Sequence, residues 1–470
     1  MSKTYYPVIG LEIHAELNTK SKMFCACKND PNEERPNINI CPVCMAHPGT
    51  LPVANGEAVK SVVRVGLALG ALIADFTEFD RKNYFYPDIP KGYQISQYKY
   101  PIVSGGKLSG VAITRIHLEE DTGLSKHDRG DFTLVDYNRA GVPLMELVTE
   151  PVIHTARAAA DFARELQLLL RTLGVSDANL EKGEMRVEPN ISISDVEGKF
   201  GTKVEIKNLN SFKSVEKAIE CEFARMIALY EAGRQDEIVQ ETRGWDEAKQ
   251  TTFSQRSKEN ANDYRYFPDP DLPKMQLHRL FDLEQMKADL PELPWNTRTR
   301  YADIYAMKEN DIEVYLNDKV LALYFESVVA GRDAAFAKTA SNYLVSDFLG
   351  LRKTNSEVQL PSKEHFAELI GMVVDGELTS RGAKDILAMI VINPASPKLL
   401  ATEHGLLQEN NADALRPLIA EIIAQNEKIV ADYRSGKESA LQALVGMTMK
   451  ASKGSANPGI ALALLKELLG

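Results

Sequence analysis

Five segments between residues 10 and 207 alternate apolar and charged residues with a period of two. In the first, GLEIHAEL (residues 10–17), a strand places Leu11 and Ile13 on one face and Glu12 and His14 on the other. A period of two is typical of a strand with one buried face, so a chain that repeats it is constrained toward an antiparallel sheet. An isolated Glu-His-Glu face is typical of a solvated surface, whereas a metal-binding or acid–base face requires partners in other segments.

The other four segments carry such partners. In VAITRIHLEED a strand aligns Arg115, His117 and Glu119, and in VPLMELV it places Glu146 among apolar neighbours. A carboxylate in such surroundings is costly unless it is paired or bound to a metal. Together the five segments predict a sheet whose open face is a polar cleft. RVEPNISIS and TKVEIKN supply the remaining alternating charges, which are Arg186, Glu188, Lys203, Glu205 and Lys207.

A polar cleft with carboxylates, histidines and lysines meets the requirements of a magnesium-dependent phosphate-transfer site. The sequence contains neither G-x-x-x-x-G-K-[ST] nor G-x-G-x-x-G after a strand, so any ATP would be held by side chains and metal on the sheet. The net charge of -11 argues against a broadly basic surface for non-specific nucleic-acid binding. A local basic surface could still hold a structured RNA.

Four of the five cysteines lie in two close pairs, C-A-C and C-P-V-C. Two pairs separated by a loop can present four thiolates to one tetrahedral zinc ion and leave no open coordination position. We therefore predict a structural zinc at Cys25, Cys27, Cys41 and Cys44. A redox pair and unrelated buried thiols are the alternatives, and the absence of a secretory segment disfavours the redox pair.

The segment FDRKNYFYPDIPKGYQISQY (residues 79–98) interleaves Arg81, Lys82 and Lys91 with aromatic residues and prolines. Its prolines give it loop character. Cations beside aromatic rings suit the end of a nucleic acid, where bases stack and phosphates pair with Lys or Arg. A packed loop whose cations keep their charged ends in water is an equal alternative.

These segments, together with RIHLEEDTG, DYNRAGVPLMELVTEP, KNLNSF and DYRYFPDPDLP, resemble the B subunit of aspartyl/glutamyl-tRNA amidotransferases over the first 290 residues or so. The resemblance implies an ATP-dependent carbon–nitrogen ligase. In that family the B subunit holds misacylated Glu-tRNA(Gln) or Asp-tRNA(Asn) and uses ATP and magnesium to phosphorylate the side-chain carboxylate of the attached amino acid. The amidase (A) subunit of the complex releases ammonia from glutamine, and this ammonia displaces the phosphate. A small (C) subunit completes the heterotrimer.

The same resemblance assigns site residues in this sequence. It matches the family's metal site to His14, Glu119 and Glu146, with Glu12 beside them, and these four are the predicted magnesium ligands and catalytic residues together with Lys82. The segment at residues 263–266 is expected in the cleft wall, where a structural role is equally open. The predicted cofactor contacts are Lys91, Lys203 and Glu205, and the predicted tRNA contacts are Lys450 and Lys453.

The resemblance further implies an α+β fold with a mainly antiparallel, glutamine-synthetase-like sheet cradle and flanking helices in residues 1–293. A helical domain in residues 294–400 and a small helical tRNA-binding tail in residues 401–470 are expected to follow. Proline-rich stretches at residues 268–295 predict the first boundary, and Gly350 is predicted to end a helix. By charge alone, the basic stretch GMTMKASKGSANPG is as compatible with a solvated linker as with an RNA contact.

No apolar run reaches the length needed to cross a bilayer, which predicts a cytoplasmic protein without a membrane partner. Two functions therefore remain open from the sequence. One is the ATP-dependent synthetase subunit of the amidotransferase. The alternative is a non-catalytic, zinc-containing, tRNA-binding scaffold of the same complex.

Overall fold

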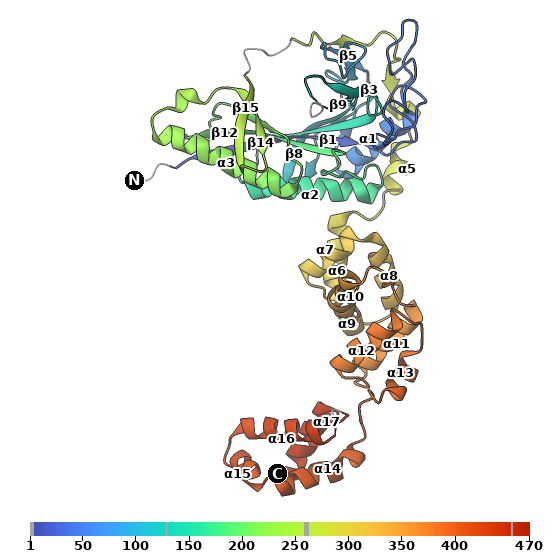
Figure 1. Ribbon diagram of the computed structural model, residues 1–470, viewed down its shortest axis with the longest axis vertical. Helices are drawn as coiled ribbons and strands as arrows, with labels where there is room; N and C mark the ends of the chain where they lie inside the picture. The colour runs from blue at the N-terminus through green and yellow to red at the C-terminus, as the bar shows by residue number, and fades with distance from the viewer. Residues whose placement is uncertain (1–3, 127–129, 258–262, 453–454) are drawn as a thin grey trace. The chain divides into compact units, whose positions relative to one another are not determined.

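The computed structural model describes residues 4–126, 130–257, 263–452 and 455–470. It separates into two compact units, Met1–Pro294 and Trp295–Gly470. The division falls inside the second proline-rich stretch, where repeated prolines interrupt both helix and sheet. The first unit contains the sheets, and the second is helical (Figure 1). The architecture is therefore the predicted α+β arrangement.

The first unit contains a ten-stranded sheet. In spatial order its strands are β15 (Thr251–Ser257), β14 (Glu241–Asp246), β13 (Val204–Lys207), β12 (Met185–Ser194), β1 (Tyr6–Glu16), β11 (Pro143–Thr149), β8 (Val111–Glu120), β6 (Val103–Ser104) and β2 (Leu72–Ile73), with β7 (Lys107–Leu108) beside β8. All five alternating segments are strands of this sheet, and they occupy five consecutive positions in it: β13, β12, β1, β11 and β8. In the described residues β13 and β14 pair in parallel and the other neighbours are antiparallel.

Three helices lie along one face of this sheet (Figure 1), namely α1 (Gly56–Ala68), α2 (Ala156–Leu173) and α3 (Phe212–Glu231). That face is apolar because Leu11 and Ile13 point into it and are at most 1% exposed. Helix α2 begins after the side-chain cap of Thr155 and ends at Gly174, which has the left-handed conformation that glycine tolerates. With one face covered by helices, the charged side chains of the same strands occupy the other.

The segment at residues 79–98 is not a loop throughout, which corrects the prediction. It contains β4 (Asp80–Asn83) and β5 (Tyr93–Ser96), which form a three-stranded sheet with β16 (Phe267–Pro268). The prediction was wrong because Asp-Arg-Lys-Asn in β4 has no apolar alternation to mark a strand. The other short elements of this unit are β3 (Phe76–Thr77), β9 (Leu124–Lys126), β10 (Leu134–Asp136), β17 (Met275–Gln276), η1 (Gln235–Glu237), α4 (Leu277–Leu280) and α5 (Leu283–Ala288).

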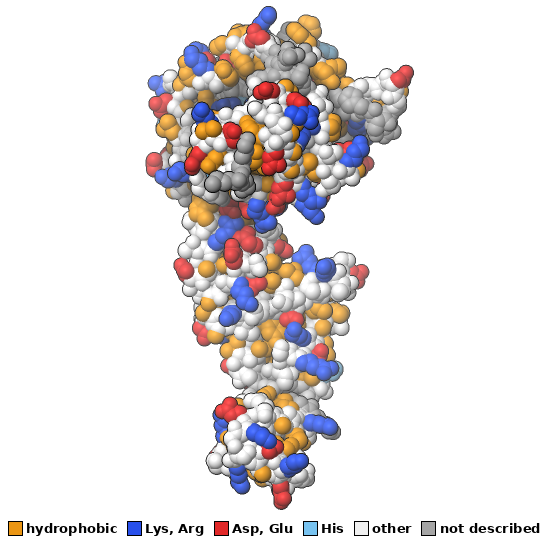
Figure 2. All heavy atoms as spheres, turned by 90° about the vertical axis from the view of Figure 1, so that its left-hand side faces the viewer, with side chains coloured by type: hydrophobic (Ala, Val, Ile, Leu, Met, Phe, Trp, Pro, Cys, Tyr) orange, Lys and Arg blue, Asp and Glu red, His pale blue; other side chains and the backbone are white. Residues whose placement is uncertain are grey.

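The second unit contains two buried apolar clusters, one that includes Phe325 and Phe366 and one that includes Ile419 and Leu444. Its charged side chains are mixed, with Lys and Arg interspersed among Asp and Glu on the face that Figure 2 shows. No helix in the described ranges is long and apolar enough to span a membrane. The helices are α6 (Pro294–Tyr305), α7 (Glu309–Asn317), α8 (Lys319–Val329), α9 (Ala334–Asn342), α10 (Leu349–Thr354), α11 (Lys363–Val374), α12 (Ser380–Ile390), α13 (Pro397–Glu403), α14 (Ala412–Gln425), α15 (Glu427–Arg434), α16 (Glu438–Ala451) and α17 (Pro458–Leu469).

Two positions at which the sequence predicted an end or a boundary lie inside helices of this unit. Gly350 does not end a helix, because a π-helical segment, Tyr343–Phe348, connects α9 to α10 and the helical path continues through the glycine. The burial of Phe348 holds this segment in place. The predicted boundary between residues 400 and 401 lies within α13, and the division of this unit into a helical domain and a tail stays a prediction.

Candidate functional site

A row of four charged or titratable side chains crosses the polar face of the sheet. Arg186 of β12 pairs in register with His14 of β1, His14 with Glu146 of β11, and Glu146 with His117 of β8. Residues directly opposite in an antiparallel pair have Cβ atoms about 4.5–5.5 Å apart. The order and register of the strands therefore bring these four side chains together, and all four come from strands.

The four predicted magnesium ligands converge on this row. His14 Nε2 lies 3.4 Å from Glu146 Oε2, 3.6 Å from Glu119 Oε1 and 3.8 Å from Glu12 Oε1. These separations exceed a good N–H···O hydrogen bond, yet they are within the roughly 4.2 Å that separates opposite ligands of an octahedral magnesium ion. Glu119 and Glu146 are 3% and 6% exposed. The cluster has the spacing and the donor atoms to hold a divalent cation.

The pKa values of the cluster show how much negative charge it concentrates. Burial, followed by the charge of Glu146, raises the pKa of Glu12 to about 7. Burial would lower the pKa of His14, but Glu146, Glu188 and Glu119 raise it to about 9. Burial opposes ionisation of Glu146 too, whereas His117 and His14 hold its pKa well below the usual value. In the protein alone, a proton on His14 balances charge that a bound cation would neutralise.

Lys82 of β4, which the family resemblance assigns as a catalytic residue, lies at the edge of this cluster, and that role stays a prediction. Burial would lower the pKa of Lys82, but the charge of Glu119, with contributions from Tyr266 and Glu146, raises it above its usual value. The rings of Tyr98 and Tyr266 stack with their centres 4.5 Å apart, so part of the 263–266 segment forms an aromatic wall beside the lysine. Asp263, at the start of this segment, is 82% exposed at its side chain.

Lys91 is paired with Glu120. Its Nζ donates a hydrogen bond to Glu120 Oε1, and the same oxygen accepts a hydrogen bond of 2.9 Å from the backbone N–H of Ile95. Lys91 and Glu120 also line a cavity of about 240 Å³, together with Cys25 and Cys44. The structure therefore brings Lys91 next to the cysteine loop, with its charge paired to Glu120.

The other predicted cofactor contacts, Lys203 and Glu205, lie at the start of β13 and differ in their surroundings. Lys203 precedes β13 and is exposed, whereas Glu205 lies in β13 and accepts a hydrogen bond of 2.7 Å from the Thr242 hydroxyl. Lys207, two residues further along β13, is the lysine that joins the polar face, with Nζ 2.8 Å from Glu188 Oε2 and 3.6 Å from Glu205 Oε1. Alternation had already placed Lys207 on the polar face in phase with Glu205, although it was not among the predicted cofactor contacts.

The predicted tRNA contacts lie in the second unit. Lys450 is exposed near the end of α16. Lys453 lies outside the described residues. Neither placement assigns an RNA contact, so both remain predictions.

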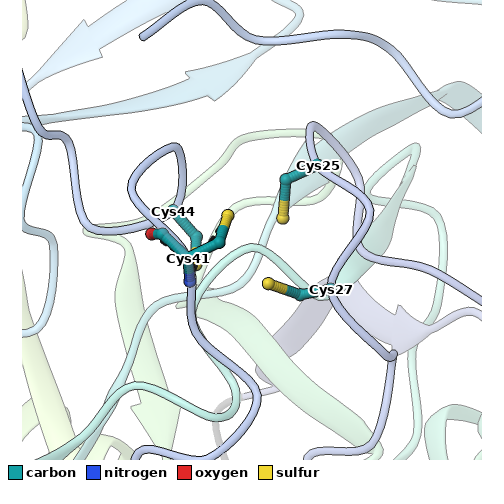
Figure 3. Close-up of side chains that lie close together, drawn as sticks. All are labelled: Cys25, Cys27, Cys41 and Cys44. Atoms are coloured by element: carbon teal, nitrogen blue, oxygen red, sulfur yellow. Dashed lines mark hydrogen bonds between the residues drawn. The ribbon is translucent and has the colours of Figure 1, made fainter.

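The four clustered cysteines come together as predicted. Their sulfur atoms lie within 4.8 Å of one another, and Figure 3 shows all four side chains around one centre. The Sγ atoms of Cys41 and Cys44 are 3.9 Å apart, close to the roughly 3.8 Å edge of a tetrahedron with 2.3 Å zinc–sulfur bonds. A hydrogen bond with Cys25, together with the backbone of Cys41 and the charge of Lys22, lowers the pKa of Cys44 to about 5 against the effect of burial. The cluster could hold a metal ion.

Two residues near these clusters were not predicted as site residues. His117 is 3% exposed and directed at Glu146, and its alternation with Glu119 was the available signal. Lys22 is fully buried, and its Nζ donates a 3.0 Å hydrogen bond to the carbonyl of Tyr137. Nothing in the sequence marks Lys22, because its environment is created by a chain segment more than 100 residues away.

Comparisons with known proteins agree with the motifs. The GatB/GatE catalytic domain model matches residues 7–281, and a GatB domain model matches residues 323–469. One B subunit of aspartyl/glutamyl-tRNA(Asn/Gln) amidotransferase from Clostridium acetobutylicum is 43% identical, and the B subunits from Thermoanaerobacter pseudethanolicus and Thermotoga maritima are 43% and 42% identical. Each alignment covers 99% of both chains. The chain therefore belongs to the family of aspartyl/glutamyl-tRNA(Asn/Gln) amidotransferase B subunits.

Proposed function

We propose that this chain is the synthetase subunit of a tRNA-dependent amidotransferase. It phosphorylates the side-chain carboxylate of Glu-tRNA(Gln), Asp-tRNA(Asn) or both, and ammonia then converts the activated group to the amide. The observation that carries this proposal is that His14 Nε2 lies within 3.8 Å of the carboxylates of Glu12, Glu119 and Glu146 on the polar face of the sheet. Lys82 lies near enough for Glu119 and Glu146 to raise its pKa.

The chemistry has two balanced steps. In the first, a carboxylate oxygen of the aminoacyl group attacks the γ-phosphorus of ATP, the bond to the bridging oxygen breaks, and ADP leaves. In the second, ammonia attacks the acyl carbon, inorganic phosphate leaves, and a proton is lost to give the amide. A carboxylate needs this activation because oxide is too poor a leaving group at neutral pH.

The residues of the polar face have distinct tasks in these steps. Glu12, His14, Glu119 and Glu146 would hold magnesium, which neutralises charge on the nucleotide phosphates when it is bound. The ammonium group of Lys82 opposes the negative charge that develops on the transferred phosphoryl group. Burial of Glu119 and Glu146 keeps bulk water away from this point, which protects an acyl phosphate from hydrolysis.

The cysteine loop, the partner proteins and the C-terminal helices have the other tasks in this function. Zinc bound by Cys25, Cys27, Cys41 and Cys44 would fasten the loop after β1, and a set of four thiolates would leave no open position for catalysis. Ammonia comes from a partner that is an amidase, and a third, small protein completes a cytoplasmic heterotrimer, as family membership supports. The C-terminal helices around Lys450 bind the body of the tRNA.

The test compares the wild-type complex with Glu146→Gln, using ATP with Glu-tRNA(Gln) or Asp-tRNA(Asn). Ammonia is supplied both by the amidase partner and as free ammonium, so that loss of ammonia transfer can be separated from loss of activation. Glu150→Gln is the matched control, because Glu150 follows the same strand and accepts a hydrogen bond from Thr114 outside the cluster.

We expect phosphate release and amide formation to be lost in Glu146→Gln with both ammonia sources, while tRNA binding and the control variant stay unchanged. Unchanged activity in Glu146→Gln would move catalysis away from this cluster. It would then favour the alternative, a zinc-containing scaffold that holds tRNA.

A further inference from the structure

Lys22 is a buried cation that has no task in the proposed function. It lies in the loop after β1 and is fully buried, and its Nζ donates a hydrogen bond of 3.0 Å to the carbonyl oxygen of Tyr137. A carbonyl oxygen satisfies one of the three donors of an ammonium group but carries no net charge. No carboxylate in the described ranges forms an ion pair with Lys22. Lysine is almost never fully buried unless its charge is paired, so an anion of another kind is expected nearby.

The four-cysteine cluster supplies such an anion. Lys22 and Cys44 border the same glycine, because a Cβ at Gly141 would lie 3.6 Å from Lys22 Cδ and 3.8 Å from Cys44 Cβ. Cys44 is buried, whereas the other three cysteines of the cluster are partly exposed. The carboxylate of Glu120 comes within 3.9 Å of the same point, but it already pairs with Lys91. The thiolate that Cys44 presents to a metal ion is therefore the unbalanced negative charge beside Lys22.

We propose that the ammonium group of Lys22 is the counter-charge of the zinc-binding thiolates and raises the affinity of the cysteine cluster for the ion. Four thiolates exceed the charge of one zinc ion by two negative units, so negative charge remains when the ion is bound. Burying that charge is costly unless a cation offsets it. Because it presumes a bound zinc ion, this role of Lys22 rests on the zinc-binding part of the proposed function.

Hydrogen bonds fix Lys22 beside the cluster. Its backbone N–H donates a hydrogen bond of 2.9 Å to the carbonyl of Cys27, and the N–H of Met23 donates one of 2.7 Å to the carbonyl of Gly141. The ammonium group binds the carbonyl of Tyr137, four residues before that glycine. Lys22 is thus held between the cysteine loop and the segment that leads into β11. Since the group is shielded from water, its attraction for the thiolates is screened less than that of a surface lysine.

The first measurement is the zinc affinity of the full chain, by competition with a chromophoric chelator of known affinity. Lys22→Met keeps an apolar side chain of similar length in the buried site and removes the charge. Lys22→Gln removes the charge and keeps an N–H donor for the carbonyl of Tyr137. We expect both variants to bind zinc about 10- to 100-fold more weakly than the wild type, the usual cost of losing a partner just outside the ligands.

Lys28→Met is the matched control. Lys28 directly follows Cys27, but its side chain is 69% exposed and its Nζ lies 2.7 Å from Asp30 Oδ2. The substitution removes the same charge from the same loop at a position where water screens it. We expect the zinc affinity of this variant to equal that of the wild type.

Cobalt provides a second readout that a merely structural role would not move. Co²⁺ replaces Zn²⁺ at tetrahedral thiolate sites, and its sulfur-to-cobalt charge-transfer band reports how tightly the thiolates hold their electrons. Loss of a neighbouring positive charge makes those electrons easier to transfer. The band should therefore shift to longer wavelength in Lys22→Met and Lys22→Gln and stay in place in Lys28→Met. The ligand-field bands should remain those of a tetrahedral site, because all four sulfur ligands are retained.

The outcomes separate this role from the function on which it rests. If the cluster of the wild type binds neither Zn²⁺ nor Co²⁺, the zinc part of the proposed function fails and the role of Lys22 fails with it. Wild-type affinity in a folded Lys22 variant overturns the role of Lys22 alone and leaves the zinc site standing. Weaker binding without the shift of the charge-transfer band also overturns it, because Lys22 would then support the loop by packing. A thermal melt shows which variants are folded, and either Lys22→Met or Lys22→Gln is sufficient for the test.

Discussion

The Nζ of Lys82 lies 5.2 Å from the centre of the Tyr264 ring, so a cation from β4 is held by a residue that follows it by more than 180 positions. A cation over an aromatic face is stabilised without being neutralised. Lys82 therefore keeps its full charge next to Glu119 and Glu146, where phosphoryl oxygens are expected to bind.

Replacement of Lys82 by methionine keeps much of the side chain's length and removes its charge. We expect the rate of ATP-dependent amide formation to fall about 100-fold or more, the cost of losing one preorganised charge donor in the transition state. Affinity for tRNA should change little. Lys99→Met is the control, because Lys99 Nζ also lies 5.2 Å from an aromatic ring, that of Tyr100. Equal rates in the two variants would contradict a role for Lys82 in phosphoryl transfer.

The cysteine cluster predicts one zinc ion per chain by elemental analysis. Cys44→Ser should lose this ion and lower the melting temperature by about 5 °C or more, because metal-binding free energy at a structural site contributes to folding. Cys221→Ser, which changes a thiol of α3 outside the cluster, should keep the zinc and the wild-type melting temperature. Zinc content that is unaffected by Cys44→Ser would exclude the cluster as its site.

Glu16 should make stability depend on pH. Burial, followed by the charge of Asp121, raises the pKa of Glu16 to about 8, above its usual value of 4.5. The folded chain thus keeps a proton that the unfolded chain releases, so this stabilisation is fully present below about pH 4.5 and is lost as pH rises through about 8. Glu16→Gln mimics the protonated group and should remove that dependence.

The measurement is the free energy of unfolding of wild type and Glu16→Gln in urea at several pH values from about 5 to 9. The wild type should lose stability relative to the variant by up to about 1.4 kcal/mol per pH unit in this range. Curves that stay parallel would show that Glu16 has no raised pKa in the folded chain.

The strands of the polar face were predictable because each has one buried face and one charged face. Alternation placed Glu12, His14 and Glu119 correctly on their strands, and it found Glu146 as an out-of-place carboxylate. It could not give the order of strands in the sheet. That order determines which charges meet, and only the family resemblance joined these residues into one site beforehand.

Other features depend on contacts that leave no local pattern. The strand β4 is polar on both faces and pairs with β16 from a distant segment. No alternation of apolar and polar residues could therefore predict that it is a strand. Lys91 stays a predicted cofactor contact, and the sequence could not show that its charge pairs with Glu120, because that partner is set by how β5 lies against the end of β8. Charge and spacing identify candidate residues, whereas packing decides which partner each one obtains.

The position of β1 between β11 and β12 has a consequence for biosynthesis. Glu12 pairs in register with Val148 on one side and with Glu188 on the other. The first strand to be synthesised therefore cannot pair until β11 and β12 have been made. A nascent chain that ends before β12 exposes an unpaired edge of β1 with one apolar face, the kind of edge that invites aggregation. The polar face is complete only after the ribosome has released the segment through Lys207, the last residue of β13. A chain truncated before β12 should therefore fail to bind the cation, because its β1 lacks one of the two strands that hold Glu12 and His14 in place.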